Sequence, residues 1–157
     1  MTGRLGVLGL ALVVAACASP PVLDEPLGRV PDVRGRWEGV WGGTPVSLLV
    51  VTQDEAAGEG TIMLGRWTLA GAPLPAIEGV FTFAVDGAPV SVNVRGRFGD
   101  LGGHLALVVD LLTADGDWLL LDRVREDRLA GRGSSRLPWY PRGAVTLVRV
   151  SADGASR

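Results

Sequence analysis

Hydrophobic and polar residues alternate along much of the chain after residue 33. The clearest case is the run from Val90 to Phe98, VSVNVRGRF, in which the valines and the phenylalanine fall on one face and Ser, Asn and Arg on the other. A period of two residues predicts a β-strand with one dry and one wet face. No long window has apolar residues at helical spacing, so the pattern favours an all-β domain.

Turn signals divide this pattern into about nine candidate strands. Asp86-Gly87 and Asp115-Gly116 mark two hairpins, because this dipeptide tolerates the positive φ that tight turns need. The candidate strands cover residues 34–41, 45–53, 60–69, 79–85, 90–98, 103–113, 117–126, 128–132 and 144–150. Because most connections are short, successive strands are expected to pair antiparallel.

An antiparallel up-and-down meander of eight or nine strands has two edges to protect. Closing the sheet into a small barrel removes both edges, which favours a barrel, with a two-sheet sandwich as the alternative. The triplets Gly35-Arg36-Trp37, Gly65-Arg66-Trp67 and Gly96-Arg97-Phe98 recur at spacings of 30 and 31 residues. This echo suggests related hairpin units around the sheet, although three short matches also arise by chance.

The first residues form an uninterrupted apolar run instead. Arg4 precedes the apolar or small residues 5–16, and the only cysteine of the chain, Cys17, follows them. Twelve residues rise roughly 18 Å as a helix, which is too little for a hydrocarbon core of about 30 Å. Residues 1–16 are therefore expected to be a signal peptide rather than a membrane span.

The ending Val14-Ala15-Ala16-Cys17 resembles the lipobox of bacterial lipoproteins. The resemblance implies cleavage before Cys17 and acylation of this cysteine, which would anchor the mature chain in a membrane. In proteobacterial lipoproteins an aspartate after the cysteine favours the inner membrane. Ala18 stands here, which favours the outer membrane, facing the periplasm. An ordinary signal peptide with an incidental cysteine is the alternative.

Composition sets the remaining domain boundaries. Residues 17–32 hold four of the ten prolines among charged residues, which predicts an extended tether reaching about 46 Å. Residues 33–150 are long enough for a single β-barrel domain with one core. Residues 151–157 are expected to be a disordered tail.

The triplet Gly35-Arg36-Trp37 also resembles the Gly-x-Trp on the opening strand of lipocalins and the wider calycin group. In those barrels an arginine from near the end of the chain packs over the tryptophan and closes the base. The resemblance implies that Trp37 is buried and that Arg149 has this structural role. The later lipocalin motif, with its aspartate and tyrosine, has no match in this chain.

Charge and reactive residues exclude several functions. Without Arg4 the chain has 14 arginines, no lysine and 17 acidic residues, a net charge of about −3, which is unlike a nucleic-acid binder. The only histidine, His104, lies about 20 Å along its strand from Asp110, and no Gly-x-Ser-x-Gly is present, so no catalytic pair is expected. Asp115 and Asp117 are expected to form a polar hairpin tip rather than a calcium site. We expect no enzyme activity, no cofactor and no metal.

The segment from Ser134 to Gly143, SSRLPWYPRG, is the longest irregular stretch of the domain. The candidate ligand-binding residues in it are Arg136, Trp139, Tyr140 and Arg142. Loops at barrel mouths often bind ligands, and an aromatic pair between arginines suits an apolar or anionic molecule. Alternatively, the aromatic rings fold back onto the end of the barrel.

Two functions follow from these patterns. The first is a lipid-anchored envelope barrel that binds a small apolar or amphipathic molecule. The second is a structural or accessory envelope lipoprotein whose filled barrel contacts a partner protein. An eight-stranded barrel is just wide enough either to fill with side chains or to hold one small ligand, so strand number does not separate the two.

Overall fold

The structure, a computed structural model, describes residues 30–54, 62–64, 67–69 and 75–151. In these ranges all regular structure is β, as the alternating pattern predicts, and there is no helix. The strands are β1 (Gly35–Trp41), β2 (Thr44–Gln53), β3 (Ile62–Leu64), β4 (Trp67–Leu69), β5 (Ala76–Val85), β6 (Ala88–Asp100), β7 (Leu105–Leu111), β8 (Trp118–Val124), β9 (Arg128–Ser134) and β10 (Gly143–Arg149).

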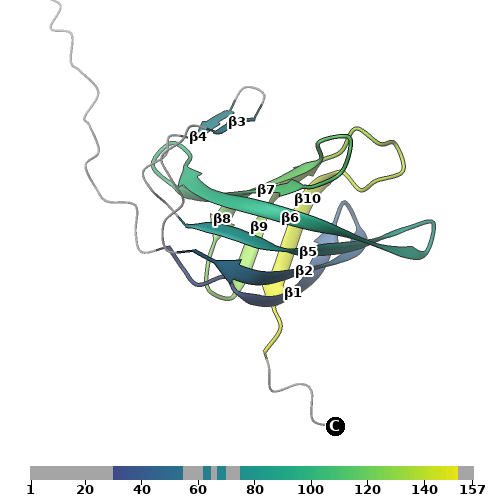
Figure 1. Ribbon diagram of the computed structural model, residues 1–157, viewed down its shortest axis with the longest axis horizontal. Helices are drawn as coiled ribbons and strands as arrows, with labels where there is room; N and C mark the ends of the chain where they lie inside the picture. The colour runs from purple at the N-terminus through teal and green to yellow at the C-terminus, as the bar shows by residue number, and fades with distance from the viewer. Residues whose placement is uncertain (1–29, 55–61, 65–66, 70–74, 152–157) are drawn as a thin grey trace, which may run out of the picture.

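Eight of these strands close into one barrel (Figure 1). Their order around it is β1-β10-β9-β8-β7-β6-β5-β2, and every neighbouring pair is antiparallel. The first and last strands pair with Trp37 opposite Arg149, which completes the ring. The expected meander and barrel are confirmed over the sandwich. In the closed barrel the two edge strands of the sheet pair with each other, so neither edge is left open.

The prediction of one strand over residues 60–69 is wrong. The structure has two short strands there, β3 and β4, which pair with each other in a separate two-stranded sheet. The alternation in this stretch contains Gly60 and Gly65, and glycine weakens a strand interior. Trp67 therefore lies on β4, outside the barrel sheet, and the Gly-Arg-aromatic triplets do not mark a repeated hairpin unit.

The interior of the barrel is one apolar core. On β7 the face with Leu107, Val109 and Leu111 is buried, as alternation predicts. Large aromatic side chains from the early strands join it, including Trp37 and Trp41, both fully buried. The core residues are Val33, Trp37, Trp41, Val46, Leu48, Val50, Ile77, Phe81, Phe83, Val94, Phe98, Leu107, Val109, Leu111, Leu119, Leu121, Leu129, Val145 and Leu147.

Two glycines allow the aromatic and branched side chains to fill this interior. A Cβ at Gly133 would lie 2.5 Å from the Trp41 ring, and a Cβ at Gly96 would lie 2.6 Å from the side chain of Ile77. Both distances are below the 3.0 Å that real Cβ contacts respect. The core is therefore close-packed around both Gly133 and Gly96.

Strands β7 and β8 are also buried on part of their outer faces. Ala106, Val108 and Leu120 form a second, smaller cluster, with Leu101 and Trp118 partly buried against it. A strand covered on both faces reads as a nearly continuous apolar run rather than an alternating one. This explains the sequence LALVVDL of β7.

The ladder between β8 and β9 is irregular. Its register shifts between Leu120 and Arg123. Such a shift reverses which residues face outward. As a result Leu121 is buried in the core while Arg123 and Arg125, which share its parity in the sequence, are exposed.

Candidate functional site

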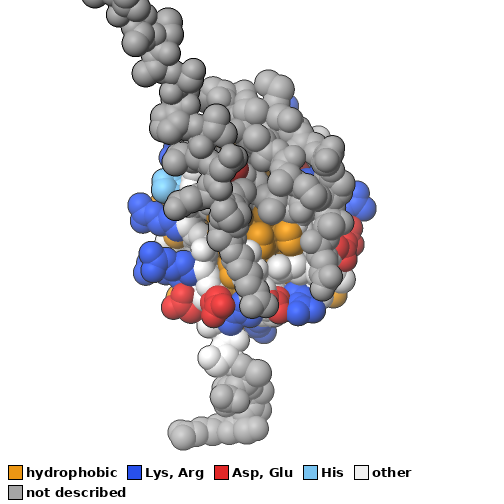
Figure 2. Space-filling model, turned by 90° about the vertical axis from the view of Figure 1, so that its left-hand side faces the viewer, with side chains coloured by type: hydrophobic (Ala, Val, Ile, Leu, Met, Phe, Trp, Pro, Cys, Tyr) orange, Lys and Arg blue, Asp and Glu red, His pale blue; other side chains and the backbone are white. Residues whose placement is uncertain are grey.

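The barrel has two ends that differ in chemistry. We call the base the end formed by residues 30–34, the connections 101–104 and 125–127, and Val150. The tip is the end formed by the turns 42–43 and 86–87 and the connections 112–117 and 135–142. Figure 2 looks onto the base, where arginine and acidic side chains lie around the rim. The described chain enters at the base, so the predicted ligand loop lies at the opposite end.

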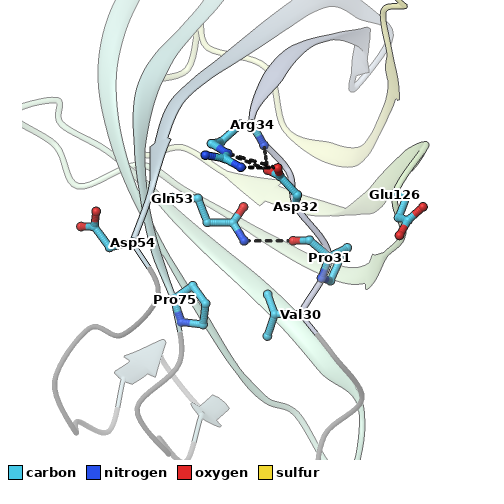
Figure 3. Close-up of a pocket in the computed structure, with 8 residues that line it drawn as sticks. All are labelled: Val30, Pro31, Asp32, Arg34, Gln53, Asp54, Pro75 and Glu126. Carbon is cyan, nitrogen blue, oxygen red and sulfur yellow. Dashed lines mark hydrogen bonds and ion pairs between the residues drawn. The ribbon is translucent and has the colours of Figure 1, made fainter.

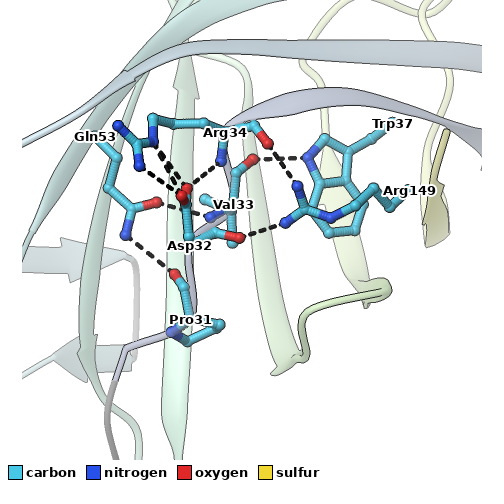
Figure 4. Close-up of polar contacts among 7 residues, drawn as sticks. All are labelled: Pro31, Asp32, Val33, Arg34, Trp37, Gln53 and Arg149. Carbon is cyan, nitrogen blue, oxygen red and sulfur yellow. Dashed lines mark hydrogen bonds and ion pairs between the residues drawn. The ribbon is translucent and has the colours of Figure 1, made fainter. Parts of the chain in front are cut away.

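Arg149 closes the base (Figure 4). Its guanidinium carbon lies 4.5 Å from the centre of the Trp37 ring. Its Nη1 donates to the carbonyl of Arg34 at 2.6 Å, its Nε donates to the carbonyl of Glu126 at 2.6 Å, and its Nη2 donates to the carbonyl of Asp32. The indole Nε1 of Trp37 donates to the carbonyl of Val33 at 2.8 Å. One planar cation thus joins the entering segment to the β8–β9 turn.

Further contacts hold residues 31–34 against the barrel. The side chain of Gln53 accepts from the amide of Val33 at 2.8 Å and donates to the carbonyl of Pro31 at 3.0 Å. Asp32 pairs with Arg34 at 2.6 Å, and hydrogen bonds from Arg34 lower the pKa of Asp32 to about 2. Ordered contacts therefore begin before Val33, within the stretch predicted as tether.

A pocket of about 490 Å³ opens beside these residues (Figure 3). Its lining is mixed: Val30, Pro31 and Pro75 are apolar, while Gln53 and Asp54 lie on one side and Glu126 on the other. Asp32 and Arg34 face each other in it and satisfy each other's charge. Among the residues that the structure describes, no three His, Cys, Asp or Glu side chains are grouped to hold a metal ion.

Aromatic rings close the tip. Trp41 packs edge-on against Phe81 and Phe83, with ring centres 5.9 and 6.2 Å apart. Tyr140 packs edge-on against Phe83 at 4.7 Å. Edge-to-face geometry is the favourable arrangement for aromatic pairs. Tyr140, a predicted ligand-binding residue, therefore folds back onto the end of the barrel.

One polar atom in this aromatic cluster lacks a partner. The Nε1 of Trp41 is buried and finds no hydrogen-bond acceptor in the described part of the chain. An unpaired buried donor costs about 1–3 kcal/mol. The close fit of the Trp41 ring against Gly133 leaves no room for a side-chain acceptor at that position.

The other predicted residues of the tip loop face outward. Trp139 is 59% exposed, in contrast to its neighbour Tyr140. Arg136 and Arg142 are exposed, and Arg142 donates to the carbonyl of Arg136 at 3.3 Å. The structure thus separates the predicted aromatic pair into one ring that plugs the barrel and one that is presented to the surroundings.

Asp117 positions this loop, a role that the sequence pattern did not indicate. It is 1% exposed, not a residue of a solvated hairpin tip. Its Oδ2 accepts from the Thr113 hydroxyl at 3.0 Å, and its Oδ1 accepts from the amide of Arg136 at 3.1 Å. A buried carboxylate with two donors fixes the start of the tip loop relative to the β7–β8 connection.

The remaining sequence candidates are not part of the contacts described above. Cys17 and the predicted signal peptide fall outside the described residues. Asp110 is exposed on the outer face of β7, where partial desolvation raises its pKa and Arg97 opposes that change. His104 is exposed at the base.

Comparison with known proteins adds no family assignment. No protein-family model matches the chain, and no curated protein or solved structure is significantly similar to it. In the described residues no helix is long and apolar enough to cross a membrane.

Proposed function

We propose that this chain is a non-enzymatic, lipid-anchored protein of the bacterial cell envelope that contacts a partner protein through its tip. The observation that carries the proposal is the contrast between a close-packed interior and an exposed Trp139. The core side chains fill the barrel down to glycine positions that admit no Cβ. Trp139 is 59% exposed in the same loop as the exposed Arg136 and Arg142, and tryptophan and arginine are enriched in protein interfaces.

The proposed anchor is Cys17, in an outer membrane facing the periplasm. The sequence Val14-Ala15-Ala16-Cys17, followed by Ala18, supports it. The described chain enters the barrel at the base. A chain tethered through this end leaves the tip free to meet a partner.

Membership of the calycin group is part of the proposal. Gly35-Arg36-Trp37 opens the first barrel strand, and Arg149 on the last strand packs over Trp37. This contact supports the resemblance at the level of fold, and fold alone does not give function.

A second candidate is capture of a small apolar or amphipathic molecule at the mouth of the barrel. The observation in its favour is the same exposed Trp139, because an indole ring in a loop that also carries two arginines suits an amphipathic ligand. Such a ligand would sit on the plug formed by Tyr140 and Phe83 rather than inside the barrel.

Site-specific crosslinking in cells tests the first candidate. A photoreactive amino acid replaces Trp139, and the matched control carries it at Val148, which is 51% exposed on the barrel wall. We expect a discrete protein adduct from position 139 that is absent from position 148. Equal adduct patterns at both positions would contradict a tip interface. A small-molecule passenger that co-purifies with the native chain and is lost in Trp139→Ala would favour the second candidate.

Metabolic labelling with a clickable fatty acid tests the anchor separately. The unaltered chain is expected to label and to sediment with membranes, and Cys17→Ser is expected to lose the label, because acylation needs the thiol. Labelling of the serine variant would overturn the lipoprotein assignment.

A further inference from the structure

Three arginines line one groove on the outer wall of the barrel at the base. Arg123, Arg125 and Arg128, from β8, the β8–β9 turn and β9, surround a pocket of about 460 Å³. Its floor is formed by the small residues Ala130 and Thr146 on the neighbouring strands β9 and β10. Small floor residues let a ligand approach between the longer side chains of the walls.

The register shift in β8 builds this groove. Without it, Arg123 and Arg125 would share the inward parity of Leu121. With it, Arg123 lies opposite Ala130 and all three guanidinium groups are exposed. β-Bulges often re-aim side chains in this way.

The charge of the groove is not balanced by its own residues. Asp127 is the one acidic residue that lines it, against three arginines. In the described part of the chain none of these arginines forms an ion pair with a carboxylate. Guanidinium groups bind phosphate and carboxylate oxygens in pairs of hydrogen bonds, so the groove suits an anion with phosphate oxygens.

The groove adjoins the point at which the chain enters the barrel. Arg149 donates to the carbonyls of Glu126 and Asp127 in the β8–β9 turn, and to the carbonyls of Asp32 and Arg34 in the entering segment. The arginines of the groove are thus fixed next to the segment that leads to the N-terminal anchor. A membrane that holds the chain through the proposed anchor at Cys17 would face this end of the barrel.

We propose that Arg123, Arg125 and Arg128 bind the phosphate of an anionic phospholipid headgroup and dock the base of the barrel on the membrane surface. The choice of a lipid as the source of the phosphate rests on the proposed anchor at Cys17. Binding to the groove itself needs only the three guanidinium groups. The tip then points away from the membrane.

Titration of the full-length chain in a non-ionic detergent tests this proposal. The titrants are short-chain phosphatidylglycerol, short-chain phosphatidylcholine and inorganic phosphate, and the readout is the arginine Nε–H resonances. Arg123→Gln/Arg125→Gln/Arg128→Gln is the test variant. Arg36→Gln/Arg95→Gln/Arg97→Gln is the control, with the same loss of charge elsewhere on the barrel.

We expect phosphatidylglycerol to bind at least about tenfold more tightly than phosphatidylcholine, because attraction to an anionic lipid grows with each arginine. This preference should disappear in the test variant and persist in the control. Equal binding of both lipids, or binding that survives the three substitutions, would contradict the proposal that the groove binds the headgroup. Inorganic phosphate that binds as tightly as phosphatidylglycerol would overturn the lipid assignment in favour of a free-anion site.

Two further measurements keep the outcome clear. If the triple variant does not fold, Arg125→Gln alone must weaken phosphatidylglycerol binding, and the resonances that shift in the unaltered chain must be those of the groove. The soluble titrants do not require acylation of Cys17, so a negative result here is distinct from loss of the anchor or of a tip partner.

Discussion

The base and the tip close the same barrel with different chemistry. At the base, the guanidinium of Arg149 covers Trp37 and meets three backbone carbonyls. At the tip, Tyr140 covers Phe83 by ring contact, and the buried Nε1 of Trp41 has no acceptor in the described chain. The buried indole Nε1 of Trp37 is paired with the carbonyl of Val33, and buried polar groups that are paired help to specify one arrangement. We therefore interpret the base as a structural closure, and we propose that the exposed residues of the tip serve in recognition.

The largest expected effect is at the base. Trp37→Ala removes a fully buried indole that also donates to the carbonyl of Val33. We expect a loss of about 3–5 kcal/mol in the free energy of unfolding, measured by urea denaturation. Trp139→Ala at the tip is the control and should stay within about 0.5 kcal/mol. A loss below about 1 kcal/mol for Trp37→Ala would remove it from the core.

Removing the polar contacts of Arg149 at the base should lower the free energy of unfolding by less than removing Trp37. Arg149→Met keeps most of the apolar stem but leaves three carbonyls without their donor. We expect a loss of about 2–3 kcal/mol, and only partial recovery in Arg149→Lys, because an ammonium group lacks the planar fork. Arg142→Met, which removes one contact at 3.3 Å, should change stability by less than about 0.5 kcal/mol. Equal losses at both positions would contradict the special role of the base.

Substitution of the two aromatic residues of the tip loop should change the stability by different amounts in the same urea assay. Tyr140→Ala removes an edge-to-face contact with Phe83 and the ring area packed on the core. We expect a loss of about 2 kcal/mol. Trp139→Ala should leave the urea midpoint almost unchanged and should weaken the binding of a partner or ligand at the tip. Similar stability losses in both variants would mean that Trp139 is also a packing residue.

The smallest effect concerns Asp32 at the rim of the base. Its pKa is lowered to about 2 by Arg34, below the ordinary value of about 3.9. A lowered pKa adds stability that is present above pH 4 and is lost as the pH falls toward 2. Because both side chains are more than half exposed, the loss should stay below about 1 kcal/mol. Asp32→Asn should flatten this part of the stability–pH curve, and an unchanged curve would contradict the pairing.

Alternation of side chains made the barrel strands predictable. The run from Val90 to Phe98 lies within β6, and the Asp86-Gly87 turn has the positive φ values of 51° and 81° that its sequence indicates. The pairing of β1 with β10 followed from the argument that edges must close and from the resemblance that sets Arg149 over Trp37, because no local pattern links residues so far apart in sequence. The stretch 60–69 misled because alternation does not distinguish a barrel strand from a short separate hairpin.

The functional residues were harder to predict for local reasons. An irregular loop has no periodic pattern to show which of two adjacent rings points inward. The sequence therefore predicted the same ligand-binding role for Trp139 and Tyr140. Asp117 looked like a turn residue because its partners, Thr113 and the amide of Arg136, come from two different connections. The register shift in β8 hid the arginine groove, although the density of arginines in residues 123–128 was a signal for it.

The contact between Arg149 and the carbonyl of Arg34 spans 115 residues of sequence, and this sets an order for folding. Strand β1 can pair with β2 early, but its other edge stays unpaired and the ring stays open until β10 is present. The closing step is a non-local contact of the kind that slows folding to milliseconds or seconds. A refolding experiment that compares the tryptophan fluorescence of the unaltered chain with that of Trp37→Phe should therefore isolate the signal of Trp37 and report on the joining of β1 and β10, rather than on the formation of the hairpins between them.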